Sequence, residues 1–188
     1  MKMKYATIVG SRHITSQEFV TLREVATKLC YRGYILRSGA ADGADSTINH
    51  LCDVEIILPW NGFNGFKHNG KRVWALEFLP SVTLAEERAK SIHPRPDLLT
   101  PTTLKFHARN IYQIIGPNGA AGVKSDIVVY CSDEDITGEP TGGTRTAVMY
   151  ARELGIETFN IRNKGFDADE LITRILGRIE ANREIASK

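Results

Sequence analysis

The chain has 188 residues, of which 42% are hydrophobic and 24% charged, and its formal net charge is +2. This length suits one α/β domain with a sizeable core. The near-neutral charge excludes a protein that binds nucleic acid over its whole surface, although it allows a local basic patch.

The cysteines and the N-terminus indicate the compartment. Cys30, Cys52 and Cys131 lie in apolar contexts and form no CxxC pair, which indicates buried thiols in a reducing cytosol. The N-terminus lacks the apolar region of a signal peptide, and no stretch has the length of a membrane span. The histidines lack the i, i+4 spacing of a helical metal site. We therefore expect a cytoplasmic protein without a metal or a cofactor.

Strand and helix patterns alternate at the start of the chain. Short apolar runs at 5–9, 34–37 and 54–58 predict buried strands. A helix is predicted from Thr15 or Ser16 to Cys30, and a second over about 44–51. This succession predicts βαβ units and a parallel sheet.

The middle of the chain, about 61–120, interrupts this pattern and is predicted to be an insertion. Residues 61–66 combine turn formers with aromatic residues and predict a loop, whereas 82–91 and 102–115 have helical spacing. The regular pattern then resumes. Its predicted elements are a strand at 127–131, a helix at 144–154, a strand at 156–161 and an amphipathic helix at about 168–185.

These elements predict one domain over residues 1–188. Its expected fold is α/β and Rossmann-like, with a doubly wound, mainly parallel five-stranded sheet, helices on both faces and the insertion between the βαβ halves. In such a sheet all the loops that follow strands lie at one edge, and ligands bind there.

The loops at this edge carry residues that suit a nucleotide. Small residues allow backbone amides to approach a phosphate, and Arg12 offers a guanidinium to an anion. Asp42 and Asp45 could accept hydrogen bonds from ribose hydroxyls, and Trp60 could stack on a base. Each has a structural alternative: Asp45 could cap a helix, Arg12 could be a surface residue and Trp60 a core residue.

The loop Gly142-Gly143-Thr144 lies between a predicted strand and a predicted helix, which suits a phosphate at a helix N-terminus. The preceding segment is acidic, which disfavours a purely electrostatic anion site. Its acids could point away, pair with Arg12 or Arg109, or supply a catalytic carboxylate. They are Asp133, Glu134, Asp135 and Glu139.

Two features of the insertion have open interpretations. Arg109 could reach an anionic ligand or cap a loop, while His107 and Asn110 share a helical face. The basic run 67–72 lies beside aromatic residues, and the stretch 63–74 could contact nucleic acid or form a solvated loop.

Two motifs together resemble the SLOG superfamily of Rossmann-like proteins. They are Val9-Gly10-Ser11-Arg12 and the run from Arg37 to Asp45, which are joined by Gly142-Gly143-Thr144 as a second nucleotide-binding loop. The superfamily includes the DprA/Smf proteins, the YspA/YpsA-related proteins and the LOG phosphoribohydrolases. Leu58-Pro59-Trp60 and the run from His107 to Asn110 resemble a DprA-like subgroup that is frequent in bacteriophage genomes.

The resemblance implies a nucleotide or nucleotide-derived ligand, such as a nucleoside phosphate or an ADP-ribose-like molecule, which the protein would sense, sequester or hydrolyse. The predicted ligand-binding residues are Gly10, Ser11, Arg12, Ser38, Gly39, Asp42, Gly43, Asp45, Trp60, Arg109, Asn110, Gly142, Gly143 and Thr144. If the protein is an enzyme, it would be a nucleoside-phosphate N-glycoside hydrolase in which the carboxylate of Asp45 or Glu139 activates water or stabilises an oxocarbenium-like centre.

The stretch 145–148 lacks the carboxylate that LOG enzymes carry, so we expect the glycine loop to hold a ligand rather than to cleave one. The alternative function is a single-stranded DNA-binding recombination mediator that resembles DprA. Members of the superfamily commonly self-associate, which implies a homo-oligomer.

Overall fold

The computed structural model describes residues 3–51, 53–175 and 177. Its centre is a six-stranded sheet in the order β4-β3-β2-β1-β5-β6, in which every pairing is parallel. The strands are β1 (Lys4–Gly10), β2 (Tyr34–Ser38), β3 (Val54–Leu58), β4 (Val73–Ala75), β5 (Ile127–Cys131) and β6 (Glu157–Asn160). This architecture confirms the predicted α/β, Rossmann-like class.

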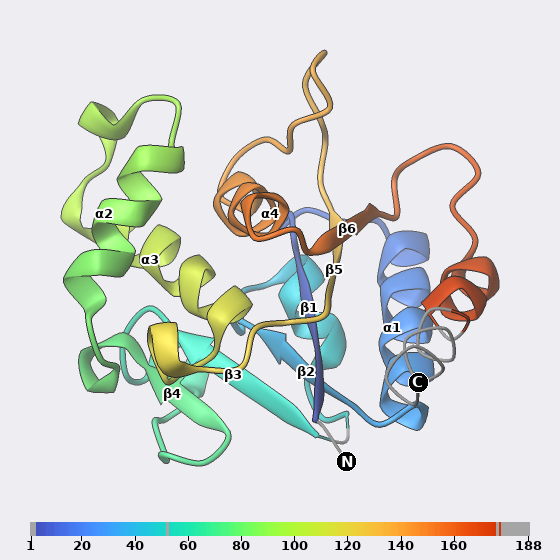
Figure 1. Ribbon diagram of the computed structural model, residues 1–188, viewed down its shortest axis with the longest axis horizontal. Coiled ribbons are helices and arrows are strands. Elements are labelled where there is room, and N and C mark those ends of the chain that lie inside the picture. The colour runs from blue at the N-terminus through green and yellow to red at the C-terminus, as the bar shows by residue number, and fades with distance from the viewer. Residues whose placement is uncertain (1–2, 52, 176, 178–188) are drawn as a thin grey trace, which may run out of the picture.

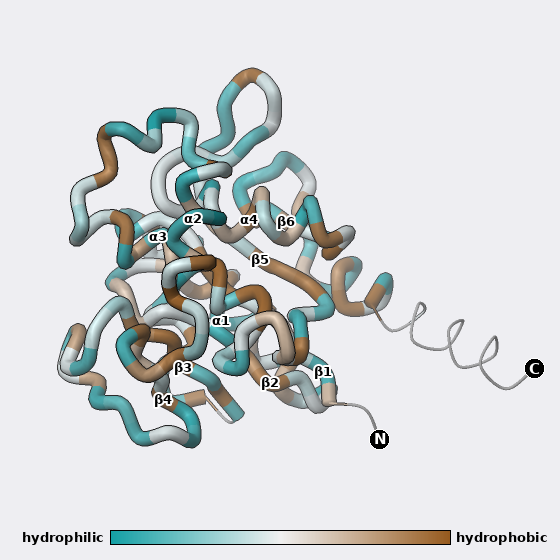
Figure 2. The backbone as a smooth tube through the Cα atoms, turned by 60° about the vertical axis from the view of Figure 1, so that its left-hand side comes forward, coloured by the Kyte–Doolittle hydropathy of each residue, from teal (hydrophilic) through white to brown (hydrophobic). Residues whose placement is uncertain are grey.

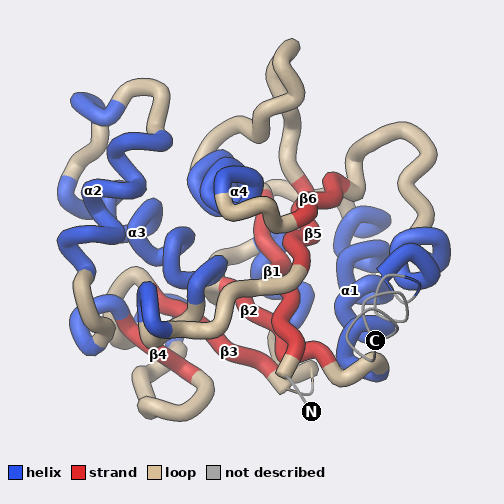
Figure 3. Tube along the Cα trace, in the orientation of Figure 1, coloured by secondary structure: helices blue, strands red, loops and turns tan. Residues whose placement is uncertain are grey.

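Helices cover both faces of the sheet (Figures 1 and 3). Helix α1 (Ser16–Tyr31) and a C-terminal helix that begins at residue 168 lie on one side, and the other long helices lie on the opposite side. These are α2 (Val82–Ile92), α3 (Pro101–Ile115) and α4 (Thr144–Glu153). The short 3-10 helices are η1 (Gly43–Ile48), η2 (Phe63–Gly65), η3 (Leu76–Phe78), η4 (Pro96–Leu98) and η5 (Gly119–Ala121).

Each face of the sheet has its own hydrophobic core. Adjacent residues of β1 divide between the cores, with Ile8 in the α1 cluster and Val9 in the cluster of α2, α3 and α4. This division follows from the twofold alternation of side chains along a strand. Figure 2 shows the hydrophobic residues concentrated in central elements such as β5, while the loops at the periphery are mostly polar.

The sixth strand departs from the predicted sheet. β4 lies inside the predicted insertion, and Trp74 at its centre pairs in register with Ile57 of β3. Three residues are too few to show the alternation that marks a strand in a sequence. β4 is a strand because it pairs with β3, which lies elsewhere in the chain. The insertion and the domain extent of 1–188 stay predictions.

Two further elements differ in detail. The helix predicted over about 44–51 is the 3-10 helix η1, which ends at Ile48. The final helix is present over 168–175 and at residue 177, and the rest of its predicted range lies outside the described residues. Cys52 also lies outside them. Within the described residues, no helix is both long enough and apolar enough to cross a membrane.

Candidate functional site

The direction of strand succession reverses between β1 and β5. The chain proceeds from β1 through β2 and β3 to β4, then returns across the sheet to place β5 on the other side of β1. The loops after these two strands therefore diverge and leave a crevice. A cavity of about 390 Å³ lies at this switch point.

The cavity wall combines several segments that are far apart in the sequence. It includes the loops after β1, β2, β5 and β6, together with one side of α3 and the start of α4. Nine predicted site residues line it: Gly10, Ser11, Arg12, Asp45, Arg109, Asn110, Gly142, Gly143 and Thr144. Six others are outside its lining: Ser38, Gly39, Asp42, Gly43, Trp60 and Glu139.

The loop after β1 is held between β5 and η1. Ser11 N donates to Cys131 O at 2.7 Å, and Ala44 N donates to Ser11 O at 3.0 Å. A Cβ atom at Gly10 would lie 2.4 Å from Cys131 O, so this close approach requires glycine. The Arg12 side chain that follows has no hydrogen bond or ion pair with any residue that the structure describes, and its guanidinium carbon lies 5.0 Å from the Phe106 ring centroid.

The loop after β2 packs against β1, the loop after β1 and Arg109, and so supports the cavity wall. Ser38 Oγ donates to Ile8 O at 2.7 Å, which joins β2 to β1. Gly43 has φ +76°, and a Cβ there would lie 2.4 Å from Ser11 O. Gly39 likewise faces Arg109, whose Nη1 would be 1.9 Å from an added Cβ. Both glycines therefore allow protein segments to approach one another.

A buried polar network connects this loop to α4. Arg109 Nη1 donates to Gly39 O at 2.7 Å and lies 3.3 Å from Asp45 Oδ2. Its Nε and Nη2 donate to Asn110 Oδ1 at 3.2 and 2.9 Å, and Asn110 Nδ2 donates to Gly143 O at 2.8 Å. Arg109 thus uses every guanidinium nitrogen within the protein.

Burial governs the titration of this pair. It raises the pKa of Asp45 and lowers the pKa of Arg109, while the attraction between the two charges opposes both changes. The geometry makes Arg109 a link between the loop after β2 and the glycine loop.

The N-terminus of α4 opens onto the cavity. Gly142 has φ +62°, which favours glycine, and Gly143 is the N-cap without a side-chain cap hydrogen bond. A Cβ at Gly143 would meet only Asn110 Nδ2, at 3.9 Å, so the space above this residue is open. Arg145 N and Thr146 N already donate to Gly142 O and Gly143 O, each at 3.3 Å, so the amides of Gly143 and Thr144 are the ones available to an anion at this helix N-terminus.

His107 contacts the first turn of α4 from the facing helix. Its Nδ1 lies 2.6 Å from Thr146 Oγ1. Burial lowers the pKa of His107 to about 4, and the charges of His93 and Arg109 act in the same direction. The ring is therefore neutral at neutral pH and adds no charge to the cavity.

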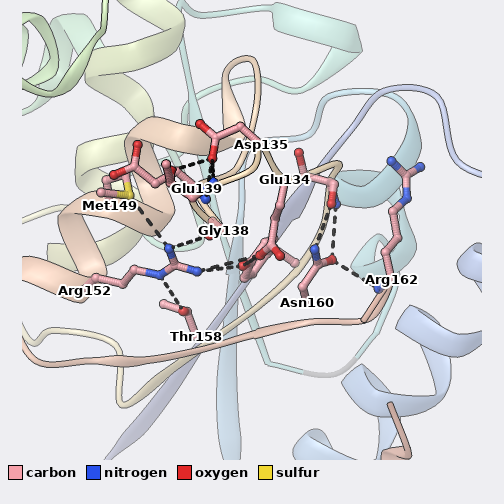
Figure 4. Close-up of polar contacts among 12 residues, drawn as sticks. Glu134, Asp135, Gly138, Glu139, Met149, Arg152, Thr158, Asn160 and Arg162 are labelled. Carbon is pink, nitrogen blue, oxygen red and sulfur yellow. Dashed lines mark hydrogen bonds and ion pairs between the residues drawn. The ribbon is translucent and has the colours of Figure 1, made fainter. Parts of the chain in front are cut away.

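The acidic loop between β5 and α4 directs its carboxylates to arginines other than Arg12 and Arg109. Figure 4 shows part of this arrangement, with Arg152 directed at Glu134. The ion pairs are Asp133 with Arg162 at 2.9 Å, Glu134 with Arg152 at 3.8 Å, Asp135 with Arg145 at 3.8 Å, and Glu139 with Arg145. Pairing reduces the repulsion that these acids would exert on an anion in the cavity.

Some lining residues were absent from the predicted site. Phe106 and His107 lie on α3, and Arg162 follows β6 and pairs with Glu18 at 2.6 Å. The rule that loops after parallel strands share one edge would also have indicated Arg162. Thr103, Phe106 and Asn110 are spaced so that they share one face of a helix. An aromatic residue on such a face more often belongs to a core, so the sequence carries no clear signal for Phe106.

The fold and this cavity define a Rossmann-like parallel α/β protein with a crevice at its topological switch point. No family model matches the chain, and no curated protein sequence matches it significantly. Solved structures do resemble it. DNA processing protein A from Helicobacter pylori, described for its single-stranded DNA binding mode, superposes with a TM-score of 0.61 at 16% identity, over 94% of this chain and 81% of that protein.

DNA processing protein A (DprA) from Streptococcus pneumoniae has a TM-score of 0.51 at 16% identity. That match covers 94% of this chain but 56% of the Streptococcus pneumoniae protein, so this chain spans little more than half of that length. The shared feature is the Rossmann-like fold of the DprA proteins. The relation to SLOG proteins more widely stays a prediction.

Proposed function

We propose that this protein binds single-stranded DNA and that the switch-point cavity holds a phosphate and sugar of the strand. The observation that carries this proposal is the unpaired guanidinium of Arg12 in the same cavity as the uncapped N-terminus of α4. An arginine and free backbone amides are the groups that proteins commonly use to bind phosphate.

The surroundings of Arg12 support this assignment. Asp45 and Asp133, the two acids in the cavity lining, are paired with Arg109 and Arg162 respectively. A cavity of about 390 Å³ falls in the size range of small-molecule sites and accommodates one nucleotide unit. The fold is also similar to that of a protein described for its single-stranded DNA binding mode.

A free nucleotide or an ADP-ribose-like molecule is the second candidate, favoured by a cavity of about 390 Å³, which is the size of a small-molecule site. Binding of such a nucleotide is favoured over hydrolysis of the nucleotide's N-glycosidic bond, because both candidate catalytic acids are paired. Asp45 Oδ2 lies against Arg109, and Glu139 pairs with Arg145 outside the cavity lining, so neither acid is free to act on a bound sugar.

The test is fluorescence anisotropy of a labelled oligothymidylate with the wild-type protein and with Arg12→Ala. We expect Arg12→Ala to weaken binding by about tenfold and to reduce the slope of log affinity against log salt by about 0.7, because one phosphate contact is lost. A panel of nucleoside monophosphates and ADP-ribose, measured by calorimetry and assayed for released base, separates the second candidate.

Lys28→Ala is the matched control, because it also removes one positive charge. Lys28 lies in the last turn of α1, whereas the cavity adjoins the loop that precedes this helix. Absence of oligonucleotide binding at low salt would contradict the proposal. Unchanged binding by Arg12→Ala, with a loss in Lys71→Ala, would move the DNA site to the exposed basic run 67–72.

A further inference from the structure

We infer that Trp60, Phe63 and Phe106 form a platform on which a nucleobase stacks beside the phosphate bound by Arg12. This inference rests on the proposed function and adds a site for the base. The three rings come from two distant segments, since Trp60 and Phe63 follow β3 whereas Phe106 lies on α3. Their ring centroids are 5.2, 5.2 and 5.5 Å apart, with interplanar angles of 85°, 72° and 75°.

The three rings form a partly exposed cluster. Each of the three residues is only partly buried, and Phe63 alone connects the group to the α1 core. Edge-to-face contacts between all three pairs hold the rings in fixed orientations. Aromatic side chains that are fixed and remain accessible are suited to stacking on bases without regard to their sequence.

Phe106 joins this cluster to the phosphate-binding cavity. Its side chain is part of the cavity lining. The guanidinium carbons of Arg12 and Arg109 lie 5.0 and 5.8 Å from its ring centroid. A strand whose phosphate contacts Arg12 would therefore have its neighbouring sugar and base next to the rings.

The loop that carries Trp60 and Phe63 is tied to the cavity wall by two residues in an unusual conformation. Asn64 has φ +46° and Ala40 has φ +55°, and Asn64 Nδ2 donates to Ala40 O at 2.9 Å. Non-glycine residues with positive φ are uncommon and occur preferentially at ligand sites. The hydrogen bond fixes the aromatic loop against the segment that precedes Ala41 in the cavity wall.

Tryptophan fluorescence tests the platform directly. The chain has two tryptophans, so in Trp74→Phe the emission comes from Trp60 alone. We expect oligothymidylate to quench this emission by half or more, because stacking on a base quenches indole. An abasic oligonucleotide of the same length and charge should bind through its phosphates and leave the emission unchanged.

Affinity supplies a second measurement. Trp60→Leu should weaken oligothymidylate binding by about tenfold, the usual effect of one lost stacking contact. It should leave the affinity for the abasic strand unchanged, and Trp74→Phe should leave both affinities unchanged. Quenching by thymidine monophosphate without oligonucleotide binding would support the platform and assign it to a free nucleotide.

Two negative outcomes have different meanings. If anisotropy shows oligothymidylate binding while Trp60 emission does not change and Trp60→Leu binds both strands like the wild type, the platform is wrong and the proposed function stands. If neither oligothymidylate nor thymidine monophosphate binds, both proposals are wrong.

Discussion

Among single side chains, we expect those of the buried pair Asp45 and Arg109 to have the largest effect on stability. Their side chains are 3% and 7% exposed, and Arg109 also positions Asn110 against Gly143 O. Removal of one partner leaves an uncompensated buried charge, which is far more costly than the loss of an exposed ion pair. Both residues line the cavity, and their contact with a ligand stays a prediction. The geometry adds a positioning role for Arg109 through Asn110.

We expect Asp45→Ala and Arg109→Met each to lower the free energy of unfolding by about 3–5 kcal/mol. The double variant should lose clearly less than the sum, because neither charge is then left alone. Urea denaturation followed by circular dichroism measures all three values. Lys28→Ala, which breaks surface pairs with Glu24 and Asp169, should change stability far less. Strict additivity of the single effects would show that the pair is not coupled.

At the scale of elements, the loop between β5 and α4 controls the shape of the glycine loop. It forms a hairpin with an antiparallel bridge between Glu134 and Pro140, and it projects from the body of the protein (Figure 1). Arg152 of α4 donates at 3.0 Å to Gly138 O, which lies in the turn of this hairpin (Figure 4). It also donates at 3.0 Å to Tyr130 Oη of β5 and so ties the turn to the sheet. The hairpin continues directly into Gly142, so its position affects the cavity wall.

Arg152→Ala should loosen this hairpin without unfolding the protein. Loss of two hydrogen bonds predicts a decrease in stability of about 1–3 kcal/mol, with faster amide hydrogen exchange concentrated in residues 133–141. Oligonucleotide affinity should fall severalfold, because the start of α4 loses its fixed position.

Arg88→Ala is the matched control for the hairpin. Arg88 pairs with Glu153, the residue after Arg152 in α4, but it does not contact the hairpin. Equal exchange rates in the wild type and Arg152→Ala would show that Arg152 does not hold this loop.

At the scale of the whole molecule, the pH dependence of folding reflects groups on both sides of the sheet. Burial lowers the pKa of His107 from 6.5 to about 4, and Arg162 lowers the pKa of Glu18 from 4.5 to about 2. The unfolded chain therefore takes up protons before the folded protein does, first at His107 and then at Glu18. Acidification destabilises the fold in both windows.

We expect stability to fall as the pH decreases from about 6.5 to 4, by up to about 3 kcal/mol from His107 alone. His107→Gln should flatten this window and leave the fall below pH 4.5 unchanged. Glu18→Gln should do the reverse. Urea unfolding at a series of pH values measures both effects, and an unchanged profile for His107→Gln would contradict the assignment.

Much of the fold could be predicted from short patterns. The sequence allowed Thr15 or Ser16 at the start of α1, and the structure has Thr15 as the N-cap, with both hydrogen bonds of a capping box to Glu18. The apolar runs gave five of the strands, because buried parallel strands have continuous β-branched sequences. β4 was not predicted, because its strand conformation depends on pairing with the edge of β3. The homo-oligomer and the cytoplasmic location stay predictions.

The chain alone therefore specified the order of its elements, the class of its fold and the edge at which the loops after its strands meet. These properties follow from local periodicity and from the common direction of parallel strands. Only the tertiary structure decided which polar residues remain available for a ligand. Arg12 and Arg109 have the same chemistry. The guanidinium of Arg109 donates hydrogen bonds to Asp45, Gly39 and Asn110, whereas that of Arg12 has no such partner among the described residues. That difference arises from contacts between segments far apart in sequence.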